Sequence, residues 1–310
     1  MENTRRDFIK ATASGSAALF LSSLQAYSLK HKTYFGMHKN YGLKILATNW
    51  GFEGSLDAFC AKAKKEGYDG IEQWWPVEKK EQDELFATLK KYNLEVGFLC
   101  GGWQSNAAEH LAYYIAAVDA AAKQNIQKPL YINNHSGRDY FSFEDNQKFI
   151  AHTTALAKQT GIKILHETHR SRMLFAAHIT KQFIQKNAEL RLTLDISHWC
   201  NVHESLLDDQ KETVEFALER TDHIHARIGY QEGPQVNDPR APEWEKTVQQ
   251  HFAWWDKVVE RKKMNGEQMT FLTEFGPPLY MQTLPYTLQP LSNQWAINVH
   301  MMQLLRKRYS

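Results

Sequence analysis

Four short apolar segments in the second half of the chain end in side chains that can bind a cation. In chain order these residues are Glu167, Asp195, His225 and Glu274. Three carboxylates and one imidazole make a donor set rich in oxygen, which suits Mn²⁺, Mg²⁺ or Co²⁺ and also admits Zn²⁺. Without a cation, converging carboxylates would repel one another and raise one another's pKa. The set therefore predicts a site for one divalent ion, with Mn²⁺ favoured.

The apolar segments that carry these side chains belong to a series that recurs along the chain. They lie at Lys44–Thr48, Gly70–Gln73, Glu95–Leu99, Pro129–Asn133, Lys163–His166, Arg191–Leu194, His223–Ile228 and Thr270–Phe275. Most are spaced by about 25–34 residues, the length of a strand followed by a helix. Helical periodicity fills the gaps at Leu56–Glu66, Glu81–Lys91, Ala107–Lys123, Phe143–Thr160, Leu174–Lys186, Glu243–Lys263 and Asn293–Arg306.

Eight such units predict an α/β fold, a (β/α)8 TIM barrel with a long loop after the seventh strand, around Gly229–Pro242. The four cation-binding side chains follow strands five to eight, and the carboxyl ends of barrel strands meet at one face. An open, doubly wound sheet is the alternative. It would normally carry a glycine-rich phosphate turn after its first strand, and residues 49–54 do not form one.

The first 26 residues have the composition of an export signal. Arg5 and Arg6 precede a short stretch of apolar and small residues that ends near Ala26. This arrangement resembles a twin-arginine signal, which a receptor reads on folded cargo. We therefore expect residues 1–26 to be removed or disordered and residues 27–310 to form a single barrel domain. The export machinery is then a partner and the periplasm the destination; an ordinary amphipathic helix is the alternative.

Composition excludes several other classes of protein. The chain has 37 Lys and Arg against 35 Asp and Glu, a net charge of +2, so a nucleic-acid partner is not expected. No apolar run reaches the roughly 20 residues of a membrane span. The three cysteines have neither the number of a disulfide framework nor the spacing of a metal site. Nothing in the sequence indicates an oligomeric state.

The pattern along the last four strands resembles that of the xylose-isomerase-like TIM-barrel superfamily, the sugar phosphate isomerase and epimerase family. The pattern is Glu167, then Asp195-x-x-His198, then His223-x-His225, then Glu274. The segments at 67–72 and 273–278 resemble the same group, and the metal ligands are similar to those of ketose 3-epimerases.

The resemblance implies roles for these residues. Glu167, Asp195, His225 and Glu274 would bind the metal, Glu167 and Glu274 would also move protons, and His198 would lie beside the substrate. The chain departs from the epimerase pattern in one place. The epimerases carry a basic residue several positions after the strand-7 histidine, whereas Arg227 comes only two positions after His225 here.

Residues at the other strand ends are candidate contacts for a carbohydrate substrate. They are Trp50, Glu72, Trp103, His135, His169 and Arg227. Aromatic faces pack against sugar C–H bonds, and fixed polar groups bind hydroxyls. Core packing is the alternative for Trp50, Trp103 and Trp199. Trp74 and Trp75 point in opposite directions because side chains alternate along a strand, so core packing is the favoured interpretation for one of them. His169 could instead orient Glu167.

The predicted activity is that of a divalent-metal-dependent sugar isomerase or epimerase. It would remove a proton next to a carbonyl and pass through an enediolate intermediate. A keto-sugar lyase or hydratase on the same metal site is the first alternative. A metal-dependent hydrolase of the endonuclease type and a carbohydrate-binding protein without catalysis are two others. The sequence identifies neither the sugar nor its substituents.

Overall fold

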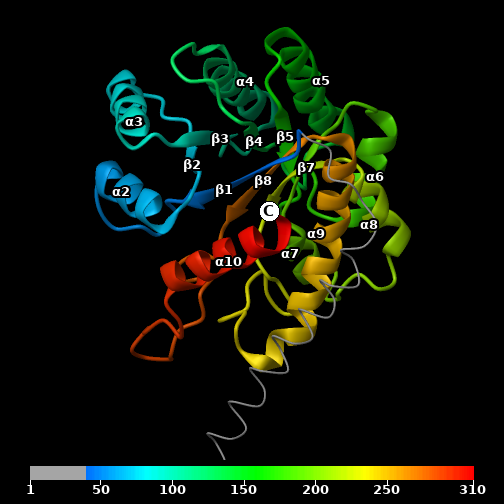
Figure 1. Ribbon diagram of the computed structural model, residues 1–310. Coiled ribbons are helices and arrows are strands. Elements are labelled where there is room, and N and C mark those ends of the chain that lie inside the picture. Colours follow the sequence, from blue (N-terminus) through cyan, green and yellow to red (C-terminus); the bar gives the residue numbers. More distant parts are fainter. Residues whose placement is uncertain (1–39) are drawn as a thin grey trace, which may run out of the picture.

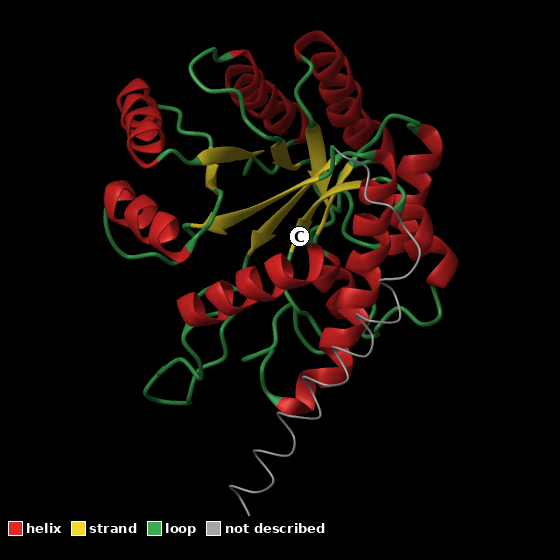
Figure 2. Cartoon of the chain, viewed as in Figure 1, coloured by secondary structure: helices red, strands yellow, loops and turns green. Residues whose placement is uncertain are grey.

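Eight parallel strands close into a barrel, and the helices lie around its outside (Figures 1 and 2). The computed structural model describes residues 40–310. The strands are β1 Gly42–Thr48, β2 Gly70–Trp74, β3 Glu95–Gly101, β4 Ile132–His135, β5 Ile164–Glu167, β6 Leu192–Leu194, β7 Thr221–His225 and β8 Gln268–Thr273. Each strand pairs with its chain neighbours, and β8 pairs with β1 from Gly42↔Gln268 to Ala47↔Thr273. That last pairing closes the barrel.

The helices alternate with the strands. They are α2 Leu56–Glu66, α3 Lys79–Tyr92, α4 Ala107–Lys123, α5 Phe143–Thr160, α6 Ala177–Lys186, α7 Ile196–Val202, α8 Lys211–Leu218, the 3₁₀ turn η1 Pro242–Trp244, α9 Glu245–Asn265 and α10 Gln294–Tyr309. Side chains at Ser55, Asn106 and Ser142 cap α2, α4 and α5 by accepting bonds from the first-turn N–H groups. No helix in residues 40–310 is long and apolar enough to cross a membrane.

The predicted (β/α)8 barrel is confirmed, including the long loop that follows β7. Every strand differs from its predicted bounds at one or both ends, and β4 and β7 show the largest shifts. β4 begins at Ile132 rather than Pro129; proline has no N–H to donate, and backbone bonds to β3 begin with the N–H of Leu130 (2.8 Å to the Val96 carbonyl). β7 ends at His225, because the chain turns there and the N–H of Arg227 bonds back to the carbonyl of His225 (3.0 Å). The predicted signal segment lies outside the described residues.

Two apolar clusters stabilise the barrel, one on each side of its wall. The larger packs the outward-facing strand residues against the helices. The smaller lies inside the barrel and consists of Leu46, Tyr131, Leu165 and Leu272, all buried. The Tyr131 ring crosses the barrel against Gly97, where an added Cβ would come within 2.5 Å of the ring. The interior is therefore filled below its upper, carboxyl end.

Candidate active site

The period-two alternation of the strands places the chemistry directly above the inner apolar cluster. Glu167 lies two residues after Leu165 on β5, and Asn133 lies two after Tyr131 on β4. Glu274 follows the end of β8, two residues after the inward Leu272. The same parity carries Asp195 and His225 inward at the ends of β6 and β7. The side chains therefore form one polar layer at the carboxyl end of the barrel.

Glu167 is buried and held by two neighbours on β4. Asn133 Nδ2 donates to its Oε2 over 2.6 Å, and His135 Nε2 lies 3.0 Å from the same oxygen. Its other oxygen, Oε1, lies 3.7 Å from Nδ1 of His225. One carboxylate oxygen is thus fixed by the strand beside it, and the other points toward the centre of the layer.

His225 lies between carboxylates on both sides of its ring. Nδ1 is 3.0 Å from Oε2 of Glu274, whereas Nε2 is 3.4 Å from Oε1 of Glu72 on β2. A carboxylate on the far nitrogen of a histidine is the usual partner of a metal-binding imidazole, because it fixes the ring and its tautomer. Glu72, a predicted substrate contact, is 3% exposed, borders the pocket described below and also lies 3.7 Å from His223.

Asp195 caps helix α7 and pairs with Arg227. Its Oδ1 accepts a bond from Ser197 N (3.2 Å) and another from the Ser197 hydroxyl. Its Oδ2 pairs with the Arg227 guanidinium, which also lies 3.4 Å from Oε2 of Glu274. Arg227, another predicted substrate contact, is only 1% exposed. Its charge therefore balances two of the predicted metal ligands.

The donor atoms come close enough together for a metal ion. Those of Asp195, His225 and Glu274 lie within 4.8 Å of one another, and so do those of Glu167, Asp195 and His198. The further groups that meet this limit are Glu72–His223–His225 and His135–Glu167–His169. Buried carboxylates around one imidazole, with a second carboxylate behind that imidazole, fit an oxygen-preferring divalent cation. The structure therefore provides residues that could hold a metal.

Charges within the layer are strongly coupled. Burial alone would raise the pKa of Glu167, but His135 and His225 hold it well below its usual range. Burial would lower the pKa of His225, yet Glu274 and Glu167 raise it well above the ordinary value. Burial raises the pKa of Asp195 to about 7, against the opposing charge of Arg227. A protonated His225 and Arg227 together supply the positive charge that the carboxylates require.

A pocket of about 490 Å³ opens above this layer. Trp74 and Tyr280 line it, together with all of the predicted substrate contacts: Trp50, Glu72, Trp103, His135, His169 and Arg227. The side chains of Trp103 and Trp74 are 63% and 39% exposed, with ring centroids 5.7 Å apart. Exposed aromatic faces over a polar floor are suited to a ligand with both C–H and hydroxyl surfaces.

Packing fixes the first wall of the pocket. The Trp50 ring meets Tyr280 edge to face, with centroids 4.8 Å apart. It lies so close to Gly276 that an added Cβ there would come within 2.4 Å of the ring. Trp50 is therefore positioned by the loop that follows β8, as well as by its own strand.

Three imidazoles form a row from the pocket wall to the polar layer. The His135 and His169 rings have centroids 4.6 Å apart, and those of His169 and His198 lie 3.9 Å apart. His198 Nε2 lies 2.8 Å from the Arg227 guanidinium. Burial holds the pKa of both His169 and His198 well below the ordinary value, so these rings are neutral.

The remaining tryptophans near the strand ends divide between pocket and core. Trp75 is 8% exposed and packs on Phe98, whereas Trp74 faces the pocket, so alternation separates the two as expected. Trp199 is fully buried and donates to the Leu174 carbonyl (3.0 Å), which makes it a core residue.

Sequence reasoning missed several residues around the site. They are Asn133, Tyr280, Arg138 and Arg172. Asn133 has the inward parity of β4 and could have been found from it. The other three lie in loops whose course the sequence does not specify.

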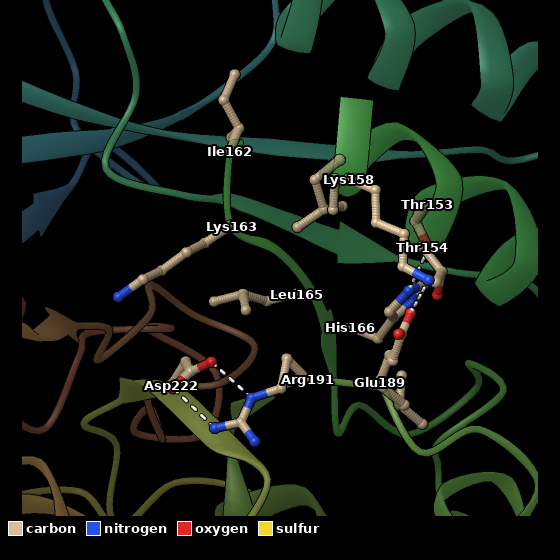
Figure 3. Close-up of a pocket in the computed structure, with 13 residues that line it drawn as sticks. Thr153, Thr154, Lys158, Ile162, Lys163, Leu165, His166, Glu189, Arg191 and Asp222 are labelled. Carbon is tan, nitrogen blue, oxygen red and sulfur yellow. Dashed lines mark hydrogen bonds and ion pairs between the residues drawn. The ribbon is translucent and has the colours of Figure 1, made fainter. Parts of the chain in front are cut away.

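A second hollow, of about 290 Å³, lies at the opposite, amino end of strands β5 to β7 (Figure 3). Arg191 and Asp222 face each other there, with Nε and Oδ2 2.7 Å apart. His166 also borders it, but its two ring nitrogens bond to Ser136 (2.7 Å) and Thr153 (2.8 Å). The polar atoms of His166, Arg191 and Asp222 are therefore already engaged in hydrogen bonds.

Comparison with known proteins places the chain in a family. Residues 60–247 match the family model described as "Xylose isomerase-like TIM barrel". No curated protein matches the chain in sequence.

Solved structures with the same fold are numerous. A 3-keto-D-glucoside 4-epimerase from E. coli is 14% identical with a TM-score of 0.57, covering 86% of this chain and 99% of its own. A probable 3-DHS dehydratase from Bacillus anthracis is 16% identical, with a TM-score of 0.54 and coverage of 85% and 98%. A family 2 AP endonuclease from Brucella melitensis is 16% identical, with a TM-score of 0.55 and coverage of 76% and 93%. At these identities, the likeness concerns the fold.

Proposed function

The chain belongs to the xylose isomerase-like TIM barrel family, and from this premise we propose that it is a divalent-metal-dependent sugar isomerase or epimerase. One observation carries the proposal. Two buried carboxylates, Glu167 and Asp195, and the half-buried Glu274 meet His225 at the floor of a pocket with aromatic walls. Glu167, Asp195, His225 and Glu274 would hold the ion, and the oxygen-rich donor set favours Mn²⁺. When bound, the ion supplies positive charge that acidifies the C–H next to a substrate carbonyl.

Glu167 and Glu274 are the proposed proton carriers. They approach His225 from β5 and from the end of β8, with oxygens 3.7 Å and 3.0 Å from its Nδ1. Neighbouring positive groups hold the pKa of both carboxyls down against burial, so both are ionised and able to accept a proton. One would take the proton from carbon to give an enediolate, and the other would return it to the opposite face.

The same two carboxylates allow a second outcome. If the group that removes the proton also returns it, to the neighbouring carbon on one face, the product is an aldose–ketose isomer. In either case, the row formed by His135, His169 and His198 borders the reacting end and can bind substrate hydroxyls. His198 is the member proposed to lie beside the substrate, and Arg227 fixes its ring.

A keto-sugar lyase or hydratase is the second candidate. It begins with the same proton removal and then expels a group from the neighbouring carbon. The chain shares its fold with a probable dehydratase, which supports this candidate. The identity of the product separates the two, since a lyase gives an unsaturated product and an isomerase conserves the formula.

The test is proton exchange on a panel of free sugars, keto-sugars and glycosides. Protein loaded with Mn²⁺ is incubated with each compound in D₂O, and the products are followed by NMR. We expect deuterium at a single carbon and an isomer of the starting sugar. Glu167→Gln and Glu274→Gln should each abolish the exchange while leaving the circular dichroism spectrum unchanged.

Glu232→Gln is the matched control, because Glu232 is exposed in the loop after β7. Full exchange in both Glu167→Gln and Glu274→Gln would refute the proposed mechanism. Cleavage of an abasic oligonucleotide, with no exchange on any sugar, would favour the hydrolase. Sugar binding without a metal or turnover would favour a binding protein.

We also propose that residues 1–26 direct the folded protein to the periplasm. The paired arginines Arg5 and Arg6 support this, as does the short apolar stretch that follows them. Folding before export would allow a metal to be bound before the protein leaves the cytoplasm.

A further inference from the structure

Two arginines beside the pocket have buried N–H groups that bond to nothing. The Nε atoms of Arg138 and Arg172 are buried and lack a hydrogen-bond partner. Arg172 is 3% exposed, and its Nη1 makes one long bond to the Gly102 carbonyl (3.3 Å). Arg138 bonds through Nη2 to the Trp103 carbonyl (3.2 Å). A guanidinium carries five donors, so most of the donors on these two groups remain available.

Both guanidinium groups lie on one ring at the pocket wall. Their central carbons are 6.0 Å and 4.8 Å from the centroid of Trp103, for Arg138 and Arg172 respectively. All three residues border the pocket. Burial lowers the pKa of Arg172 to about 10, and the charge of Arg138 adds to this lowering. The two cations therefore repel each other across a shared aromatic face.

These charges have no carboxylate of their own. Within residues 40–310, neither Arg138 nor Arg172 forms an ion pair, and nor does Arg170, which also borders the pocket. Arg170 bonds to the neutral Asn201 side chain (3.2 Å) and lies over Tyr280. Arg227, by contrast, is paired with Asp195 and Glu274. Buried charges are normally paired, because desolvation without a partner is costly.

We propose that the substrate is an acidic sugar, whose carboxylate or phosphate group binds Arg138 and Arg172 beside Trp103. Arg170 adds positive charge to the same pocket. Guanidinium groups bind both kinds of anion through paired, charge-assisted hydrogen bonds. With the anionic end there, the rest of the sugar extends along the aromatic walls toward Glu167 and His225. This inference names the substrate class of the proposed sugar chemistry and rests on that proposal.

The experiment compares ligands that differ in one group. Binding of D-galactose, D-galacturonate and D-galactose 6-phosphate to the full chain is measured by calorimetry at low and high salt. We expect at least one acidic sugar to bind about 10-fold or more tightly than galactose, since charged hydrogen bonds add affinity. The advantage should shrink at high salt. The acidic sugar with the higher affinity, galacturonate or galactose 6-phosphate, shows whether the arginines bind a carboxylate or a phosphate.

Variants assign the effect to the named side chains. Arg138→Gln and Arg172→Gln should each weaken binding of the acidic sugar by a larger factor than binding of galactose. Arg240→Gln is the matched control, because Arg240 is exposed in another loop at the same end of the barrel and pairs with Asp238. Arg138 is only half-buried, so its replacement disturbs folding less. If Arg172→Gln does not fold, Arg138→Gln alone tests whether the arginines bind the anionic group.

The outcomes separate this inference from the proposed activity. Binding of acidic sugars that depends on the arginines, but without deuterium exchange, would support the inference and count against the isomerase. Exchange on neutral sugars that bind as tightly as acidic ones would overturn the inference alone. Equal losses for galactose and the acidic sugars in both arginine variants would also overturn it.

Discussion

Arg227→Met tests how the barrel balances its buried carboxylates. Arg227 is fully buried and pairs with Asp195, and it lies 3.4 Å from Glu274. Removing one partner of a buried ion pair costs about 3–5 kcal/mol, because the other charge remains without compensation. For a chain of this length, that loss lowers the melting temperature by roughly 5–8 °C. We expect this loss in protein freed of metal by a chelator.

The same substitution should strengthen metal binding. The guanidinium touches two of the proposed ligands, so it lies on the order of 4 Å from an ion held by them. With a doubly charged ion, this gives a repulsion of about 8 kcal/mol at an effective dielectric constant of ~20. Part of this repulsion is relieved when the arginine moves aside. We therefore expect Mn²⁺ to bind Arg227→Met roughly 10- to 100-fold more tightly than the wild type.

Thermal unfolding with and without Mn²⁺ measures the first effect, and calorimetry with Mn²⁺ measures the second. Bound Mn²⁺ should restore much of the lost stability, since it replaces the missing charge. Arg240→Met, which removes an exposed guanidinium, should change neither quantity. A metal-free Arg227→Met protein as stable as the wild type would refute the charge-balance argument. Weaker Mn²⁺ binding in that variant would refute the argument that the charge of Arg227 repels the ion.

Three further predictions concern other parts of the chain. Glu72→Gln should weaken Mn²⁺ binding by about 10- to 100-fold, measured by calorimetry, because Glu72 orients His225; unchanged affinity would contradict this. Arg191 and Lys262 hold the pKa of Asp222 below its unfolded value despite burial, so its stabilisation is present above about pH 4 and is lost as the pH falls further. Asp222→Asn should therefore lower the free energy of unfolding in urea by about 3–5 kcal/mol at pH 7. The difference in unfolding free energy between the variant and the wild type should narrow below about pH 4. A difference that stays the same at every pH would count against this role of Asp222. Replacing both arginines of Arg5–Arg6 with lysine should retain the protein in the cytoplasm, and undiminished export in a fractionation assay would exclude a twin-arginine signal.

The strands and helices were largely predictable because their signals are local. α2, α4 and α5 have the predicted bounds, and each begins at a capping side chain that precedes a periodic apolar pattern. Short helices were harder: α7 has only seven residues, too few for a periodicity to be recognised. Its start is instead fixed by Asp195, whose carboxylate accepts the N–H of Ser197.

Closure of the barrel also made part of the site predictable. In a closed parallel barrel, strand ends meet at one face, so Glu167, Asp195, His225 and Glu274 had to approach one another. The sequence could not tell whether a residue near a strand end lines the pocket or supports it. Glu72 was expected beside the substrate; it borders the pocket and also lies 3.4 Å from His225, a contact that the sequence does not show. Trp199, a possible pocket wall, lies in the core.

The sequence by itself determined the eight strand–helix units and the parity that aims particular side chains inward, since both depend on near neighbours in the chain. Only the tertiary structure decided the partners. Arg227 turns from the end of β7 onto Asp195 at the end of β6, and Arg138 and Arg172 meet over Trp103 from separate loops. Such contacts depend on the paths of loops that are distant in sequence, and no local pattern encodes them.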